Sequence, residues 1–297
     1  MTMRTYNYIK GVVWALALLA LSACSDNNGL IADSSSGVKM TFYPALSGKF
    51  GTRAIGDASG IDRLTVAVYE GAEAVEKVFS VSEDWNTVQT EGITLTLVEG
   101  RPYKLLFWAD NSDNTAYALT EDGAVSVDYT DYAGGGFGKM EELDAFYGMS
   151  YISTGAANGG TRQIVLTRPF AQLNFADKGT EPMDGCQAAV TFHSIPTVFN
   201  PFTGEVSLTD AGNDGDEVTF LFDDFPEEPL VVDGTACHYM SSNYLFAPAT
   251  GNVPVSVTFE LWQGGDVVNR LEFNGDKAIP LEMNTKTNVI GMLLKNM

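Results

Sequence analysis

Short runs in which apolar and polar residues alternate recur along most of the chain. Neighbouring side chains on a strand point to opposite faces, so this period of two predicts strands with one buried face. The clearest apolar runs are Val38/Met40/Phe42, Leu64/Val66/Val68, Ile93/Leu95/Leu97, Tyr103/Leu105/Phe107, Ala171/Leu173/Phe175, Val218/Phe220/Phe222 and Val253/Val255/Val257/Phe259/Leu261. Turn-forming pairs such as Asp122-Gly123 and Gly264-Gly265 separate them. No long segment has helical spacing, and Lys139–Tyr147 is the one place where we expect a turn or two of helix. The sequence therefore predicts an all-β sandwich fold.

The chain from Ala54 to residue 297 is longer than one sandwich usually is. Its middle contains the glycines at 134–136 and the small residues at 156–160, a composition with low strand propensity. A strong strand pattern, Gln163–Leu166, follows directly. We therefore expect two sandwich domains, one over 54–160 and one over 161–297.

The first 23 residues have the composition of an export signal. Two basic residues, Arg4 and Lys10, precede an apolar run, Val12–Leu21, which is shorter than the roughly 20 residues of a membrane-spanning helix. Small residues then lead to Cys24, as in lipoprotein precursors whose cysteine is lipidated and becomes the mature N-terminus. An uncleaved anchor helix, or an ordinary signal with a chance cysteine, is the alternative.

The residues after Cys24 are polar and small, including the serines at 34–36, which is typical of a flexible tether. We expect 24–53 to connect a lipid anchor in the outer membrane to the folded body. The tether leaves open whether that body faces the periplasm or the cell surface.

The formal net charge of the full chain is −21, and removal of the two basic residues of the signal makes it more negative. Such a charge excludes nucleic acid as a partner, because phosphates require a basic surface. It also argues against adsorption to anionic lipid. We interpret the acidity as a means of keeping an exported protein soluble.

The residues of a histidine-dependent enzyme are missing from the sequence. It contains two histidines, and His193 lies in a strand pattern, where packing in the sheet is a more usual role than that of a catalytic base. His238 follows Cys237, but adjacent residues of a strand point to opposite faces, so they cannot act as a pair. We predict that the chain is not an enzyme and needs no cofactor.

Metal binding is not indicated either. Cys186 and Cys237 do not form a CxxC motif, and their pairing as a disulfide is left open by the sequence. The acidic stretch over 210–221 resembles a calcium loop in composition only, since Gly212 and Leu221 occupy ligand positions. We interpret it as an acidic turn.

Three tryptophans, Trp85, Trp108 and Trp262, could stack on sugar rings, as in carbohydrate-binding sandwiches. The alternative is that they pack in the core, which is more usual for large aromatic residues.

Six short blocks occur in an order that resembles the fimbrillin-like lipoproteins, the subunits of type V pili. The blocks are Thr52-Arg53-Ala54-Ile55 with Ile61–Tyr69, Tyr103–Asp110, Asp144–Gly148, Arg168–Phe175, Tyr244–Pro248 and Asn284–Gly291. Each block alone is weak, and their order behind a lipoprotein signal is moderately specific. The resemblance implies two tandem transthyretin-like (Greek-key) β-sandwich domains and a role in surface fibres.

The resemblance also implies a maturation step. In that family an arginine-specific protease removes the N-terminal strand, and a strand from another subunit fills the groove. The corresponding bond here joins Arg53 and Ala54, and the lost segment contains the strand pattern Val38–Tyr43. The expected partners are other pilin subunits, the outer membrane through the lipid, and a host or bacterial surface ligand.

The C-terminal region departs from the family pattern. Six residues, Met292–Met297, follow the last block, whereas a stalk subunit presents a C-terminal strand to its neighbour. Val289–Leu294 is either that strand or the closing strand of the second sandwich. The leading hypothesis is a pilus subunit precursor, and the alternatives are an anchor or tip accessory subunit, or a non-polymerising glycan-binding lipoprotein.

Overall fold

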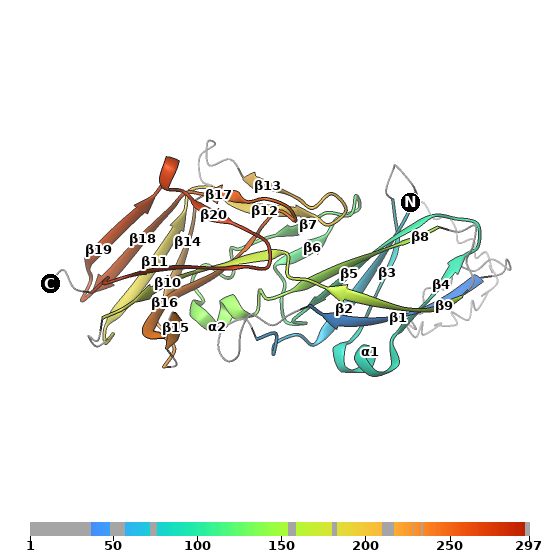
Figure 1. The fold of residues 1–297 in the computed structure, drawn as a ribbon, viewed down its shortest axis with the longest axis horizontal. Coiled ribbons are helices and arrows are strands. Elements are labelled where there is room, and N and C mark those ends of the chain that lie inside the picture. The colour runs from blue at the N-terminus through green and yellow to red at the C-terminus, as the bar shows by residue number, and fades with distance from the viewer. Residues whose placement is uncertain are drawn as a thin grey trace, which may run out of the picture.

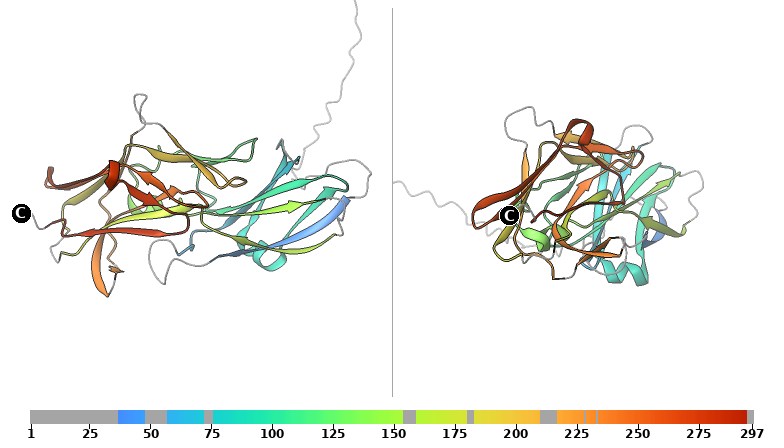
Figure 2. Two further views of the ribbon diagram at one scale, coloured as in Figure 1. Left: turned by 45° about the horizontal axis from the view of Figure 1, so that its top comes forward. Right: turned by 60° about the vertical axis from the view of Figure 1, so that its left-hand side comes forward.

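The structure is a computed structural model that describes residues 37–47, 57–71, 76–153, 159–179, 183–209, 217–227, 229–232 and 234–294. These residues form strands almost throughout, which confirms the predicted all-β sandwich fold. Figure 1 and Figure 2 show an elongated molecule with two groups of sheets arranged end to end. The predicted signal over 1–23, the lipidation site Cys24 and the cleavage site at Arg53 and Ala54 lie outside the described residues.

The N-terminal group consists of two sheets. The four-stranded sheet is antiparallel, with the order β3-β2-β5-β8, and the three-stranded sheet has the order β4-β1-β9. Their strands are β1 (Gly37–Leu46), β2 (Arg63–Glu70), β3 (Glu76–Asp84), β4 (Ile93–Val98), β5 (Tyr103–Asp110), β8 (Phe146–Ile152) and β9 (Gly160–Leu166). A short helix, α1 (Trp85–Glu91), joins β3 to β4.

One hydrophobic cluster fills the space between these sheets. It takes the alternate residues of the predicted strands, among them Met40, Phe42, Leu64, Val66, Val68, Ile93, Leu95, Leu97, Leu105 and Phe107. We call it the N-terminal core. The alternation in the sequence therefore identified the correct face of each of these strands.

The C-terminal group contains three four-stranded sheets and one two-stranded sheet. The four-stranded sheets have the orders β15-β16-β10-β21, β14-β11-β18-β19 and β13-β12-β7-β6, and the two-stranded sheet pairs β17 with β20. Their strands are β6 (Tyr117–Leu119), β7 (Val125–Val127), β10 (Phe170–Asp177), β11 (Cys186–Phe192), β12 (Ile195–Asn200), β13 (Glu205–Thr209), β14 (Val218–Phe222), β15 (Leu230–Val232), β16 (Thr235–Phe246), β17 (Val253–Val255), β18 (Val257–Gln263), β19 (Asp266–Phe273), β20 (Ile279–Leu281) and β21 (Lys286–Gly291). The helical turns are α2 (Gly136–Glu141) and η2 (Gly275–Lys277).

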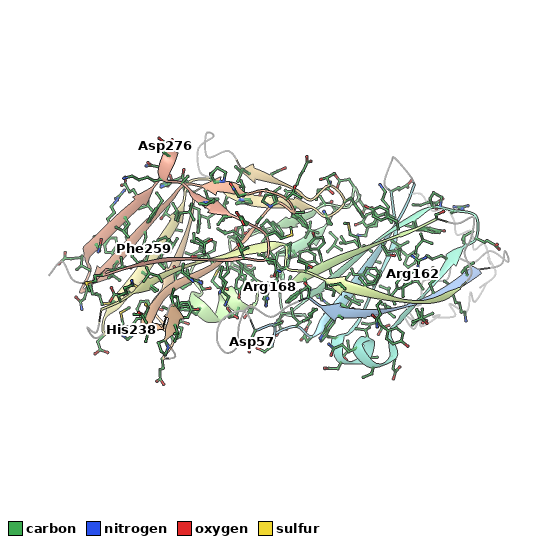
Figure 3. The ribbon with its side chains drawn as sticks, in the orientation of Figure 1. Asp57, Arg162, Arg168, His238, Phe259 and Asp276 are labelled. Atoms are coloured by element: carbon green, nitrogen blue, oxygen red, sulfur yellow. The ribbon has the colours of Figure 1, made fainter. Side chains whose placement is uncertain are left out.

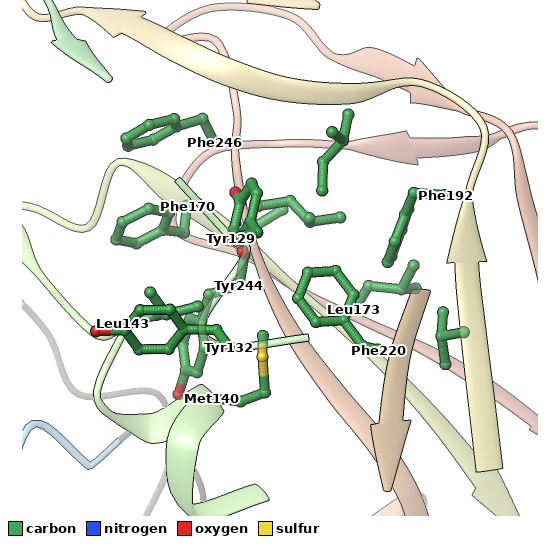
Figure 4. Close-up of a cluster of buried hydrophobic side chains, with 14 of the residues drawn as sticks. Tyr129, Tyr132, Met140, Leu143, Phe170, Leu173, Phe192, Phe220, Tyr244 and Phe246 are labelled. Carbon is green, nitrogen blue, oxygen red and sulfur yellow. Dashed lines mark hydrogen bonds between the residues drawn. The ribbon is translucent and has the colours of Figure 1, made fainter. Parts of the chain in front are cut away.

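Aromatic side chains dominate the C-terminal core, a second and larger hydrophobic cluster. Phe175 of β10 stacks on Phe259 of β18 with the ring centres 4.7 Å apart, which joins the β15-β16-β10-β21 sheet to the β14-β11-β18-β19 sheet. Phe170 stacks on Phe246 at 5.0 Å, and Figure 4 shows these two rings near Tyr129 and Tyr244. Such pairs add directional attraction to the burial of apolar area, and so fix how the sheets face each other.

Two segments contribute side chains to a different hydrophobic core from the one that their position in the sequence suggests. The region from β6 to α2 precedes β8, yet β7 pairs with β12, and Phe137 and Met140 lie in the C-terminal core. Conversely, β9 follows the predicted boundary at Gly160, yet Ile164 and Leu166 lie in the N-terminal core. The division at 160/161 remains a prediction.

The helical turn also lies earlier than expected, because α2 ends at Glu141 and Phe146 already belongs to β8.

A buried ion pair lies where the two groups of sheets meet. Arg168, between β9 and β10, donates to both carboxylate oxygens of Asp144 at 2.6 and 2.7 Å. Its guanidinium also lies 4.4 Å from the centre of the Phe146 ring. Figure 3 shows Arg168 near the middle of the long axis, with Asp57 close to it. A buried bidentate pair is costly to break, since the remaining buried charge would lose this partner. The pair therefore holds the segment between β9 and β10 and the segment before β8 in one geometry.

Candidate functional site

The strand β1 is the candidate functional element, because it is the N-terminal strand of the described chain and lies inside a sheet. On one side it pairs antiparallel with β4, from Gly37 opposite Val98 to Phe42 opposite Ile93. On the other it pairs parallel with β9, from Met40 opposite Gly160 to Leu46 opposite Leu166. We refer to β1 together with β4, β9 and α1 as the β1 site. The strand predicted over Val38–Tyr43 is confirmed, and its removal would leave two strand edges unpaired.

Apolar side chains hold β1 against the N-terminal core. Phe42 is fully buried, and its ring centre lies 5.2 Å from that of Phe107 on the opposite sheet. Met40 is buried beside it, and Val38 and Leu46 pack against the same cluster. Burying one such side chain contributes about 1.5–3 kcal/mol, and the four together contribute roughly 5–10 kcal/mol because two are only partly buried.

The helix α1 packs against β1 at one end of the site. Asp84 caps this helix by accepting a hydrogen bond from the backbone N–H of Thr87 at 2.8 Å, and the pKa of its carboxyl is lowered by that bond. Trp85 and Val88 on the inner side of the helix are buried in the N-terminal core. The helix therefore extends the apolar wall along which β1 lies.

A glycine is required where α1 ends. Gly92 has φ +73°, and a Cβ there would lie 2.7 Å from Cγ2 of Thr41 and 3.0 Å from the carbonyl oxygen of Phe42. A larger residue would therefore push β1 out of place as well as strain the backbone. Sequence reasoning missed both α1 and this contact, although a glycine just after a helix was a usable signal.

Polar contacts fix the middle and the end of β1. In the middle of the strand, the hydroxyl groups of Thr41 and Thr94 form a hydrogen bond of 2.8 Å across the β1–β4 pair. Just after its end, the N–H of Ser47 donates to the carbonyl of Leu166 at 2.7 Å, and its hydroxyl bonds that of Thr167 at 2.8 Å. The described chain resumes at Asp57, so the predicted cleavage after Arg53 stays a prediction.

The C-terminal strand is bound within its own sandwich. β21 pairs in parallel with β10, from Lys286 opposite Gln172 to Gly291 opposite Asp177. Beyond it, the carbonyl of Leu293 accepts a 2.7 Å hydrogen bond from the side-chain amide of Asn269, and Leu293 is buried in the C-terminal core. Of the two roles that the sequence left open for Val289–Leu294, the structure has the one that closes the sandwich.

The two cysteines lie in different sheets. Cys186 begins β11 and Cys237 lies near the start of β16, and both are buried free thiols in the described part of the chain. Burial raises the pKa of both thiols, so neither has the character of a reactive thiolate. His238 is half-buried beside Cys237.

His193 lies just after β11 and bridges two polar side chains. Its Nδ1 is 2.7 Å from Oε1 of Glu217, and its Nε2 is 2.8 Å from the hydroxyl of Thr258. These contacts tie the ends of β11 and β14 to β18. Across the residues that the structure describes, no three His, Cys, Asp or Glu side chains gather as a metal site would require. None of the described helices is long and apolar enough to cross a membrane.

The tryptophans separate into two kinds. Trp85 is 5% exposed and Trp108 is 1% exposed, and they lie in the N-terminal and C-terminal cores respectively. The packing alternative therefore holds for these two. Trp262 is half-buried and belongs to neither core.

The fold and the β1 site define an all-β protein in which a strand from the N-terminal end is inserted between two strands that are distant in the sequence. The chain belongs to a protein family of unknown function, DUF6562, whose model matches residues 33–297. No curated protein sequence matches it.

Several solved structures share this fold at low sequence identity. A candidate polysaccharide-binding protein of Bacteroides thetaiotaomicron has 12% identity and a TM-score of 0.53, and the match covers 87% of this chain and 93% of that one. A candidate cell adhesion protein of Bacteroides ovatus has 15% identity and a TM-score of 0.52, with 86% and 93% covered. A candidate adhesin of Bacteroides thetaiotaomicron has 13% identity and a TM-score of 0.51, with 80% and 81% covered.

Proposed function

We propose that this chain is the precursor of an adhesive fibre subunit of the fimbrillin-like kind, exported as a lipoprotein through Cys24 and exposed at the cell surface. Cleavage between Arg53 and Ala54 separates β1 from the rest of the chain, and a strand of another subunit replaces it. The observation that carries this proposal is the position of β1. It precedes Arg53 in the sequence, yet it is the central strand of its sheet.

The physical basis is the difference between a covalently attached β1 and a detached one. While attached, β1 fills its place at a high effective concentration, so no competing strand can enter. After the cut, only non-covalent contacts retain it, and the exposed edges of β4 and β9 can pair with any strand that supplies similar apolar side chains. Assembly by this route needs neither a cofactor nor an enzymatic activity of the subunit.

The solved structures of similar fold support a role at the surface, because two of them are described as adhesion proteins. The lipoprotein signal and the tether over 24–53 support the same location. Two sandwich domains, divided near Gly160, would match the tandem architecture that the family resemblance implies.

We place this subunit at an end of the fibre. A subunit in the middle must accept one strand and present another. Here the β1 site can accept a strand, whereas β21 is paired with β10 and followed by the buried Leu293. The cost of releasing β21 makes it a poor donor compared with an unpaired segment.

Limited proteolysis with an arginine-specific protease tests the proposal. We expect one early cut, after Arg53, identified by mass spectrometry from the new N-terminus at Ala54. The matched control is Arg53→Ala, which should resist cutting at this position. Light scattering should show the cut protein forming stable complexes when a subunit with a free strand is added. A first cut inside the folded body, or a cut protein that stays monomeric with such subunits, would refute the proposal.

A further inference from the structure

A surface hollow lies at one end of the β14-β11-β18-β19 sheet, far in the sequence from the β1 site. Its volume is about 640 Å³, which is within the range of small-molecule sites. The side chains that form it are Met183, Asp184, Gln187, Asp223, Phe225 and Trp262. They come from the segment before β11, from β11 and β18, and from the residues after β14.

The sheet register places three of these residues in a row. Gln187 on β11 pairs with Trp262 on β18, and paired residues lie on the same face of a sheet. On the other side of β11, Ala188 pairs with Phe222 of β14, so Asp223 follows beside Gln187. A carboxylate, an amide and an indole therefore lie next to each other on the outer face. Along each strand, the neighbouring residue points into the C-terminal core.

The strand pairing beside Trp262 is irregular. The register of the β18–β19 pair shifts between Leu261 and Trp262, because β19 has an extra residue, Val268, opposite this step, as in a β-bulge. The following turn contains Gly264 and Gly265, with φ of 62° and 93°, and Gly265 forms part of the wall of the hollow. Bulges change the direction of a side chain and are frequent beside binding sites. Here the bulge accompanies the one tryptophan of the described chain that lies outside both cores.

The chemistry of these groups is suited to a sugar. The flat apolar face of an indole matches the C–H face of a pyranose ring. An amide can donate hydrogen bonds to sugar hydroxyl groups and accept them, and a carboxylate can accept them. Asp184 and Asp223 at the hollow, and the net charge of −21, disfavour an anionic ligand. A neutral saccharide satisfies all of these conditions.

We propose that this hollow binds a neutral saccharide, with Trp262 stacked on a sugar ring and with Gln187 and Asp223 hydrogen-bonded to its hydroxyl groups. The site does not depend on cleavage after Arg53 or on exchange of β1, because its walls belong to the C-terminal group of sheets. The uncut protein should therefore bind.

Native gel electrophoresis through dissolved polysaccharide tests this with the intact, uncut protein. The probes are mannan, laminarin and arabinogalactan, with polygalacturonate as the anionic comparison. We expect at least one neutral probe to retard the protein, and Trp262→Ala to weaken that binding by at least about tenfold. Gln187→Ala, which removes hydrogen bonds and not the aromatic ring, should weaken it by a smaller factor.

The matched control is Tyr151→Ala, since Tyr151 is an aromatic residue 55% exposed on β8 of the other group. This variant should be retarded like the unmodified protein, and all variants should keep the thermal midpoint within a few degrees. If Trp262→Ala fails to fold, the retardation of Gln187→Ala decides whether the proposal stands. No retardation by the three neutral probes, retardation by polygalacturonate alone, or equal retardation of the Trp262 and Gln187 variants and the unmodified protein would overturn the proposal.

Discussion

Replacing Phe42 by alanine should remove the strongest single contact of β1 with the rest of the protein. The ring is fully buried between the two sheets of the N-terminal group and packs on Phe107 at 5.2 Å. Truncation of a buried phenylalanine to alanine costs about 3–5 kcal/mol, because the apolar area is lost and the cavity closes only in part. Domains of ordinary stability have about 5–15 kcal/mol in total, so the loss is large.

Urea unfolding followed by tryptophan fluorescence measures this effect. Trp85 reports on the N-terminal core and Trp108 on the C-terminal core. Variants that retain only one of these two, with Trp262 also replaced, therefore separate the signals of the two cores. We expect Phe42→Ala to lower the stability reported by Trp85 most.

The matched control for this substitution is Thr41→Ala, on the opposite face of the same strand. Its hydroxyl makes one exposed hydrogen bond with Thr94, which is worth about 1 kcal/mol or less. If Phe42→Ala costs no more than Thr41→Ala, β1 is not held by the core as described, and the reasoning fails.

Three further predictions concern other parts of the fold. Gly92→Ala should destabilise the protein by about 1–3 kcal/mol in the same urea assay, because of its positive φ and the contact of the new methyl group with β1; an unchanged midpoint would contradict the close approach. Asp144→Ala should lower the free energy of unfolding by about 3–5 kcal/mol, since it leaves the buried Arg168 guanidinium without its bidentate partner. Replacement of both residues by apolar ones should restore part of this loss. A double variant no more stable than the single one would argue against this. Burial raises the pKa of Tyr69 and of Tyr239 to about 12, above the usual value near 10. Their unfolded forms ionise first, so stability should be full below pH 10 and fall as the pH rises towards 12. The phenolate absorbance of these two residues, obtained as the difference from Tyr69→Phe and Tyr239→Phe variants, should appear together with unfolding; its appearance near pH 10 without any loss of structure would show that these tyrosines are accessible.

The strands were predictable because the rule that produces them is local. In the Ile93/Leu95/Leu97 and Val218/Phe220/Phe222 runs, alternate residues are buried as expected, although Val218 is buried only in part. In β10 the same pattern in Ala171/Leu173/Phe175 was visible, but its polar neighbours Gln172 and Asn174 are buried too. They are accommodated by hydrogen bonds to Ser242 of β16 and Asn288 of β21, partners that no local pattern reveals.

The partners of β1 were not predictable from the sequence pattern. β9 lies about 120 residues further along the chain, and parallel pairing over that separation depends on how both groups of sheets close. The saccharide hollow was predicted only in part. Trp262 was one of three candidate aromatic residues, and the sequence could not say which of them lies outside the cores. Gln187 was not singled out, and the sequence suggested that Asp223 belongs to a solvated acidic loop rather than to a site. The pairing of β11 with β14 and β18 is what brings both residues to Trp262.

The replacement of β1 by another strand can be measured directly with a labelled peptide of residues 37–47. Protein cut after Arg53 is freed of its own strand in mild denaturant and returned to buffer, and fluorescence anisotropy then follows binding of the peptide. Uncut protein taken through the same treatment is the control. The account predicts that cut protein binds, that uncut protein does not, and that a peptide carrying Phe42→Ala binds at least about a hundredfold more weakly. Equal binding by cut and uncut protein, or no binding by either, would contradict it.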